Sequence, residues 1–289
     1  MTELPSKEAR DAVHKTIASC GRIEYQTLGK SILGEPIYLY RVGRGKRNIL
    51  YTSAHHGSEY LTAMHLFSLL LDIADGGVST SGEAFDEFSL FFIPCVNPDG
   101  VDIALSGFRP SPLYERQLEM SGAGNPEKWK ANARGVDLNH NYPYGFAEYK
   151  AIEAARGTVA GATLYSGEYP VSEPETRAVM RPTLAVDLSL VVSLHSAGEE
   201  IFYAPKGQDV GMLADRIAGM LGYKVSTPTG TACFGGLCDY TGYSLGIPSL
   251  TIETGRGENP LPISEFFRER EVIRQALLTL PTLLSKGDL

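Results

Sequence analysis

Short apolar runs alternate along the chain with segments whose apolar residues recur at helical spacing. Four of these runs are nearly continuous, and they cover residues 49–52, 90–93, 188–192 and 249–252. The first run is followed by the i, i+3, i+4, i+7 spacing of one helical face, formed by Leu66, Leu69, Leu70 and Ile73. Apolar strands separated by helices are typical of an α/β fold in which helices cover both faces of a sheet.

No internal repeat, low-complexity tract or linker divides the chain, and 289 residues fit one large domain. We therefore predict a single domain over residues 1–289, of a size typical of a catalytic domain. Within it we expect a helical extension over residues 1–20 and a closing helix over residues 264–285. Pro281 is expected to disturb the end of the closing helix, because proline has no N–H to donate.

The charge balance argues against nucleic acid and membrane surfaces as partners. The chain has 26 Lys plus Arg and 34 Asp plus Glu, so its formal net charge is −8, and it has no block of basic residues. Its longest apolar stretch, residues 61–74, contains polar side chains and is shorter than the roughly 20 residues that span a bilayer. The first residues lack the pattern of a secretory signal, so we expect a cytoplasmic protein. The sequence does not indicate its oligomeric state.

The cysteines do not predict a disulfide scaffold or a thiolate metal site. The chain has four, and no Cys-x-x-Cys pair occurs among them. We expect reduced thiols, although Cys233 and Cys238 are close enough in sequence to pair in an oxidising compartment.

His56 and Glu59 stand three residues apart, just after the run over residues 49–52. If a helix begins there, an imidazole nitrogen and a carboxylate oxygen can reach one ion, and this donor set suits Zn²⁺. His-x-x-Glu alone is often a chance occurrence or a surface ion pair, and a catalytic zinc site needs a third protein ligand. His195 can supply it, because it ends another apolar strand, where α/β sheets bind their ligands.

A metal-dependent hydrolase also needs a base that accepts a proton from water. Glu253 follows the run over residues 249–252, again at the carboxyl end of a predicted strand. A carboxylate at the end of an apolar strand is costly unless it is paired or has a function. The residues leave two interpretations of Glu253 open, a general base and a structural ion pair with Arg256.

The segment over residues 129–143 places Arg134, Asn139 and His140 close together. Such side chains bind carboxylates and stabilise oxyanions. In the alternative interpretation, Asp137 and neighbouring polar residues satisfy the backbone groups of a loop.

Six short motifs, taken in order, resemble the zinc carboxypeptidase family of peptidases. They are His56-Gly-Ser-Glu59, Asn97-Pro-Asp-Gly100, Gly135-Val-Asp-Leu-Asn139, Ser172-Glu-Pro-Glu175, Ser193-Leu-His195-Ser196 and Thr251-Ile-Glu253. The resemblance implies a mixed parallel and antiparallel sheet flanked by helices. It also implies one zinc ion, held by His56, Glu59 and His195, with Glu253 as the general base and acid.

The same resemblance assigns Arg134 to polarising the scissile carbonyl and Asn139 to holding the substrate's terminal carboxylate. Two departures concern substrate binding. The usual Asn-Arg pair is Asn139-His140 here, and a histidine binds anions more weakly than an arginine and is fully charged only below about pH 6.5. Thr231 stands where the digestive enzymes have a mobile tyrosine, and the neutral Cys238 stands at the base of their specificity pocket.

Residues 129–139 and 251–262 resemble the bacterial branch of the family, the γ-D-glutamyl-L-diamino acid peptidases. These enzymes cut the amide between D-glutamate and meso-diaminopimelate or lysine in peptidoglycan peptides. Relatives often carry wall-binding modules and an export signal, which we do not find here, so we expect a muropeptide fragment as the substrate. Zinc, Arg134, His140 and Arg256 would hold its negative charges.

Two other functions remain open at this point. One is a zinc carboxypeptidase or N-acyl amino acid deacylase that acts on ordinary peptides. The other is a non-catalytic binding module of the same fold, against which the set of three ligands, a base and Arg134 argues.

Overall fold

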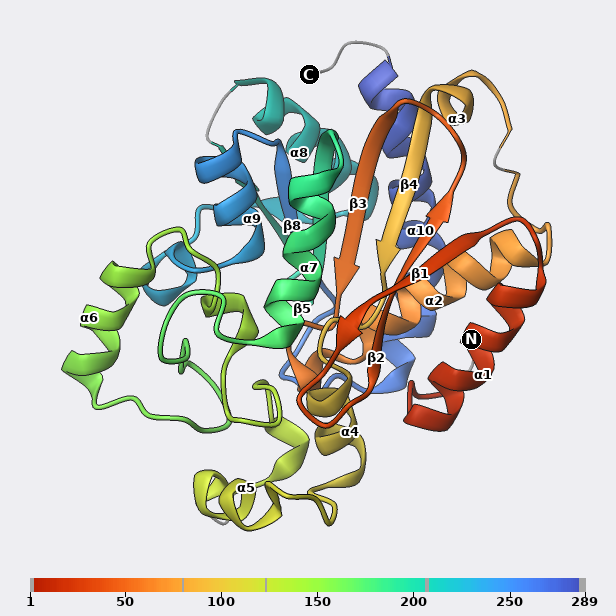
Figure 1. Cartoon of the computed structure of the whole chain (residues 1–289). Coiled ribbons are helices and arrows are strands. Elements are labelled where there is room, and N and C mark those ends of the chain that lie inside the picture. The colour runs from red at the N-terminus through yellow and green to blue at the C-terminus, as the bar shows by residue number, and fades with distance from the viewer. Residues whose placement is uncertain (1–2, 80, 123, 206–207, 286–289) are drawn as a thin grey trace.

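The computed structural model describes residues 3–79, 81–122, 124–205 and 208–285. Their centre is an eight-stranded sheet with the order β1-β2-β4-β3-β5-β8-β6-β7 (Figure 1). The strands are β1 (Glu24–Lys30), β2 (Pro36–Val42), β3 (Arg47–Ser53), β4 (Phe88–Ile93), β5 (Leu188–Ser196), β6 (Glu200–Ala204), β7 (Lys224–Val225) and β8 (Ser249–Thr254).

The helices of the described residues lie around this sheet. The α-helices are α1 (Lys7–Ser19), α2 (Leu61–Ala74), α3 (Glu83–Glu87), α4 (Pro98–Ser106), α5 (Tyr114–Ser121), α6 (Phe146–Arg156), α7 (Pro174–Ala185), α8 (Gln208–Leu221), α9 (Leu237–Asp239) and α10 (Ile263–Ser285). Short 3-10 helices are η1 (Gly57–Glu59), η2 (Pro126–Lys128), η3 (Leu138–His140) and η4 (Gly230–Cys233), and η5 (Tyr240–Ser244) is a π-helical turn.

The predicted mixed sheet is confirmed. β4, β3, β5 and β8 run parallel through its middle, while β1 with β2, β2 with β4, and β6 with β8 are antiparallel pairs. The four apolar runs of the sequence fall in the four central parallel strands. These strands are apolar on both faces because both faces are covered.

Two large apolar clusters, one on each face of the sheet, form most of the core. In β3, Ile49 and Tyr51 belong to one cluster and Leu50 to the other, as the alternation of side chains along a strand requires. Helices α1, α2, α8 and α10 pack on the first face, and α7, α9 and residues 138–142 pack on the second (Figure 1). Burying both faces fixes the register of the central strands and therefore the positions of the residues at their ends.

Pro281 lies inside α10 and does not end it. Proline cannot donate to the carbonyl four residues earlier, which is that of Leu277. The buried Tyr51 hydroxyl donates to this carbonyl instead, at 2.9 Å. Because the Leu277 carbonyl has this hydrogen bond from Tyr51 in β3, the helix continues past Pro281 to Ser285.

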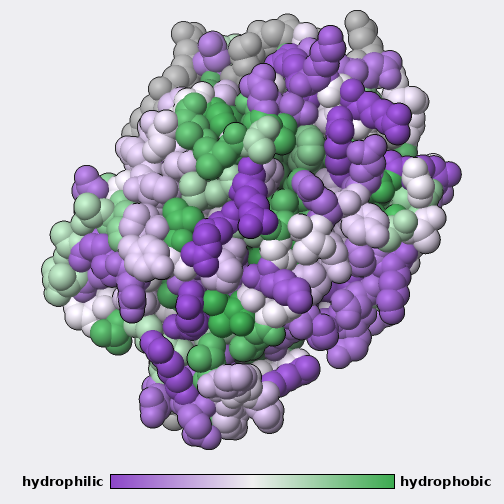
Figure 2. Space-filling model, in the orientation of Figure 1, coloured by the Kyte–Doolittle hydropathy of each residue, from purple (hydrophilic) through white to green (hydrophobic). Residues whose placement is uncertain are grey.

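The outer surface mixes polar and apolar residues. On the face shown in Figure 2, apolar residues form small groups between polar ones. The most exposed large apolar side chains of the described residues include Leu184 in α7, and Val159 and Tyr169 at separate points of the loop between α6 and α7. Such scattering is ordinary for a protein surface. No helix of the described part of the chain is both long and apolar enough to cross a membrane.

Candidate functional site

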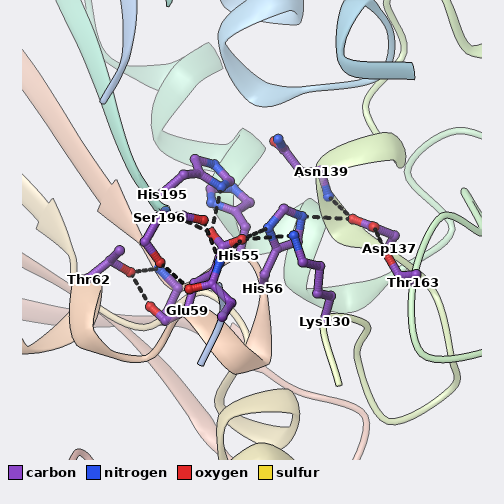
Figure 3. A network of polar contacts seen from close by, with 12 residues as sticks. His55, His56, Glu59, Thr62, Lys130, Asp137, Asn139, Thr163, His195 and Ser196 are labelled. Carbon is purple, nitrogen blue, oxygen red and sulfur yellow. Dashed lines mark hydrogen bonds and ion pairs between the residues drawn. The ribbon is translucent and has the colours of Figure 1, made fainter. Parts of the chain in front are cut away.

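Two neighbouring parallel strands, β3 and β5, bring the candidate metal ligands together at one end of the sheet. The chain leaves β3 at Ser53, and His56 then directly precedes η1, whose last residue is Glu59. His195 lies near the end of β5. Ligand atoms of these three residues lie within 4.8 Å of one another, and all three side chains are buried (Figure 3). His56 Nδ1 is 2.8 Å from Glu59 Oε1, and His195 Nδ1 is 3.1 Å from Glu59 Oε2.

Gly57 allows η1 to sit this close to its neighbours. A Cβ atom at this position would lie 2.2 Å from the carbonyl oxygen of Gly100 in α4. The N–H groups of Gly57 and Ser58 donate to the carbonyls of Lys130 and Trp129, at 3.0 and 2.8 Å. The turn that carries Glu59 is therefore fixed from two sides.

Asp137 orients the first histidine. His56 Nε2 donates to Asp137 Oδ1 at 3.0 Å, so Nδ1 is left to face Glu59 and His195. The same Oδ1 accepts from the backbone N–H of Asn139 at 3.3 Å and so caps η3. Histidine ligands of metals are commonly held in this way by a carboxylate.

The three residues fit a zinc ion. Two imidazole nitrogens and one carboxylate that converge in a buried site are the donor set of catalytic zinc. Burial disfavours the charged imidazole of His56, but the carboxylates of Glu59 and Asp137 outweigh it and raise the pKa of His56 to about 10. The position therefore favours positive charge, which a metal ion supplies.

A cavity of about 230 Å³ opens beside these ligands. Seven residues selected from the sequence line it, namely His56, His195, Glu253, Asn139, His140, Thr231 and Cys238. They come from β5, β8, η3, η4, α9 and the turn after β3, segments that are far apart in the sequence. The end of the central sheet is therefore the place where the predicted metal-binding, proton-transferring and substrate-binding side chains come together.

Glu253 lies beside His195, because the two residues are register partners in the parallel pair β5–β8. Burial raises the pKa of Glu253 to about 7. A carboxyl group that titrates near neutral pH can both accept and return a proton. Arg256 does not pair with it: Arg256 is exposed, and its Nε donates to Glu199 at 3.0 Å.

Arg134 also lies outside this cavity. Its Nη2 and Nε donate to Glu173 Oε2 at 2.8 and 3.1 Å, and its side chain lines a neighbouring cavity with Arg116 and Arg177. The structure therefore does not bring Arg134 to the zinc ligands or to Glu253.

Lys130 is a cationic residue of the cavity wall that the sequence reasoning did not select. Its Nζ donates to Glu59 Oε1 at 3.2 Å, and the negative charge of Glu59 raises the pKa of Lys130 (Figure 3). The preceding residue, Trp129, is buried and donates from Nε1 to the carbonyl of Asn132 at 3.1 Å, which fixes the backbone from which Lys130 extends. The sequence did offer a signal for selecting Lys130: it lies in the segment over residues 129–143 that was already selected, directly after the chain's one tryptophan.

The cavity wall also carries a thiol, that of Cys238. Cys238 is buried, its Sγ donates to the carbonyl of Leu250 at 3.3 Å, and burial raises the pKa of this thiol to about 12. The Sγ of Cys233 donates to a different carbonyl, that of Pro228, at 3.3 Å. Cys238 therefore presents a neutral thiol, as expected from the sequence.

Comparison with known proteins places the chain in a family. Residues 12–277 match the family model described as zinc carboxypeptidase. The chain is 28% identical over 254 residues to gamma-D-glutamyl-L-diamino acid endopeptidase 1 of Lysinibacillus sphaericus, covering 83% of this chain and 62% of that protein. It is 27% identical over 176 residues to murein peptide amidase A of Escherichia coli (strain K12), covering 58% of this chain and 57% of that protein.

The fold comparison agrees. The structure of bovine thrombin-activatable fibrinolysis inhibitor, in complex with tick carboxypeptidase inhibitor, superimposes with a TM-score of 0.75 at 19% identity and covers 99% of both chains. At this identity the likeness concerns the fold alone. Together with the family match and the convergent ligand set, it confirms the predicted resemblance: this chain belongs to the zinc carboxypeptidase family.

Proposed function

We propose that the protein hydrolyses the amide bond between the γ-carboxyl group of D-glutamate and meso-diaminopimelate or lysine in peptidoglycan-derived peptides. The observation that carries the proposal is the placement of Glu253 beside His195, in the cavity that opens next to the buried cluster of His56, Glu59 and His195. The choice of substrate is supported by the names of two relatives, an endopeptidase for γ-D-glutamyl-L-diamino acid bonds and a murein peptide amidase.

In this proposal His56, Glu59 and His195 hold the metal. Zinc bound by such a set supplies Lewis acidity, which lowers the pKa of water and polarises a carbonyl group. Glu253 accepts a proton from the attacking water, whose oxygen forms a bond to the carbonyl carbon. As the C–N bond breaks, Glu253 gives this proton to the leaving nitrogen. A carboxyl pKa near 7 suits both transfers.

We assign to Lys130 the role that the resemblance gave to Arg134, the stabilisation of negative charge on the former carbonyl oxygen. Lys130 lines the same cavity as Glu253, whereas Arg134 is held by Glu173 outside it. A fixed cation aimed at developing charge in a site shielded from water is among the larger contributions to catalysis.

Asp239 supports a diamino acid as the leaving group. Its side chain lines the cavity beside Cys238, and burial raises its pKa to about 6, so it is ionised at neutral pH. A carboxylate at this position can pair with the second amino group of lysine or diaminopimelate. An apolar leaving residue of the same length would leave that carboxylate unpaired.

The test is a peptide panel read by mass spectrometry. L-Ala-γ-D-Glu-meso-diaminopimelate and L-Ala-γ-D-Glu-L-Lys should be cleaved at the γ-amide, and the matched norleucine peptide should be cleaved more slowly. Cleavage of hippuryl peptides alone would refute the substrate assignment and favour an ordinary carboxypeptidase. Protein purified without chelators that contains no zinc by elemental analysis, and cleaves nothing, would favour a binding module.

A further inference from the structure

Asn139 and His140 stand side by side in η3, and both line the cavity that contains Glu253. By resemblance, this pair corresponds to two donors that hold a carboxylate. In this chain the pair does not offer two donors. One polar atom of each side chain is already hydrogen-bonded to a backbone group, and this leaves one donor and one acceptor for a ligand.

The orientation of the Asn139 amide is fixed by its partner. The backbone N–H of Leu237 donates to Asn139 Oδ1 at 3.2 Å. A backbone N–H can only donate, so the receiving atom is the oxygen. The NH₂ group of Asn139 is therefore the part of the side chain that remains as a donor for a ligand.

The tautomer of His140 is fixed in the same way. Its Nδ1 lies 2.9 Å from the carbonyl oxygen of Phe234, which can only accept, so Nδ1 carries the hydrogen. The ring stacks on Tyr149 with centroids 4.1 Å apart, which holds its plane. Burial lowers the pKa of His140 in spite of the nearby carboxylates of Asp137 and Glu153. In the neutral ring Nε2 therefore carries a lone pair and can only accept.

One donor and one acceptor match an amide. The carbonyl of an amide accepts from the Asn139 NH₂ group, and its N–H donates to His140 Nε2. A free carboxylate offers only lone pairs, so it would satisfy Asn139 and face the lone pair of His140. We infer that this subsite binds an amide, and not a free carboxylate, at the carboxyl group of the leaving amino acid.

The amide can come from a terminal carboxamide, which presents its C=O and one N–H on the same edge, or from a longer peptide, whose trans bond presents the C=O and N–H on opposite sides. The inference rests on the proposed function for the bond that is cleaved. Three substrates that share this bond separate the possibilities: L-Ala-γ-D-Glu-L-Lys as the free acid, as its C-terminal carboxamide, and extended by D-Ala.

With the zinc-loaded full chain at neutral pH, we expect kcat/KM for at least one of the two amides to exceed that for the free acid by about tenfold or more, since an unpaired polar group in the site is costly. A faster carboxamide or a faster extended peptide identifies the source of the amide. Equal rates for all three, or a preference for the free acid, would overturn the inference.

His140→Arg is the matched variant, because it replaces the acceptor by a donor. It should reverse the ratio in favour of the free acid, with zinc content and melting temperature showing that the variant is folded. A ratio that does not change in a folded, zinc-loaded variant contradicts the assignment to His140. The ratio measured on the unchanged chain stands even if this variant does not fold.

Binding separates this inference from the proposed function. Calorimetric titration of zinc-loaded Glu253→Gln with the three peptides should show tighter binding of the amides. If none of the peptides is cleaved by the unchanged protein but the amides bind more tightly, the proposed function fails and the inference holds. If neither amide binds more tightly than the acid, the inference fails whatever is cleaved.

Discussion

Replacing Lys130 by methionine removes a charge from the cavity wall with little change of shape. Lys130 Nζ is 3.2 Å from Glu59 Oε1, and the nearby backbone is fixed by buried Trp129. The variant should therefore keep its local structure and lose the proposed stabilisation of the oxyanion. Lys130→Arg keeps the charge and serves as the conservative variant.

The size of the effect follows from two independent considerations. Loss of one oxyanion donor costs about 100- to 1000-fold in kcat, or about 3–4 kcal/mol. Coulomb's law gives about 4 kcal/mol for unit charges about 4 Å apart at an effective dielectric constant of about 20. We therefore expect kcat to fall about 100- to 1000-fold for Lys130→Met, with KM changing less than about threefold because the charge develops only in the transition state.

Arg134→Met is the matched control. Arg134 is partly exposed and pairs with the buried Glu173, so its loss should lower the unfolding free energy by about 1–3 kcal/mol and leave kcat of the folded protein nearly unchanged. Steady-state kinetics on the γ-D-Glu-L-Lys peptide and zinc analysis of each variant provide the readout. A zinc-loaded Lys130→Met within about fivefold of the unchanged protein, or a larger kcat loss for Arg134→Met, would refute the assignment.

Three further outcomes are expected. Glu253→Gln should retain zinc and lose about 100- to 10,000-fold in kcat, as the removal of a general base does; a near-normal rate in single-turnover assays would exclude this role. Removing zinc with a chelator should lower the melting temperature, and zinc added back should restore it, because the ion binds the folded state; an unchanged melting temperature would argue against the buried site. Glu175 is buried in the folded state, and burial raises its pKa to about 7. The protonated form is favoured by folding, so its contribution to stability falls by up to about 3 kcal/mol as pH rises from about 4.5 to about 8. Glu175→Gln should therefore be relatively more stable at the higher pH in urea unfolding, and an equal difference at both pH values would contradict this.

The central sheet could be predicted because β3, β4, β5 and β8 bury both faces and so consist of apolar runs. The outer strands gave no such signal. In β1, most side chains are exposed, and β7 has only two residues, so neither leaves a periodic apolar pattern. Such edge strands are specified by pairing with a neighbour rather than by burial.

One candidate metal ligand and the candidate base could be predicted for a similar reason. His195 and Glu253 are held at strand ends by the register of the sheet, which the sequence pattern reflects. The ion-pair partners of the long cationic side chains could not be predicted. Arg134 binds Glu173 and Lys130 binds Glu59, and these contacts depend on how loops fold over the sheet edge. A lysine or arginine in a loop carries no periodic signal of what it faces.

A single carboxylate oxygen joins the candidate metal ligands to the proposed substrate subsite. Asp137 Oδ1 accepts from His56 Nε2 and from the N–H of Asn139. We therefore expect that a shift of His56 on loss of the ion would change the hydrogen bond that caps η3, and with it the placement of Asn139 and His140. Linked equilibria are reciprocal, so ligand affinity and metal affinity should change by the same factor. An amide-bearing peptide in the cavity should then slow the escape of zinc to a chelator, and the metal-free protein should bind that peptide more weakly.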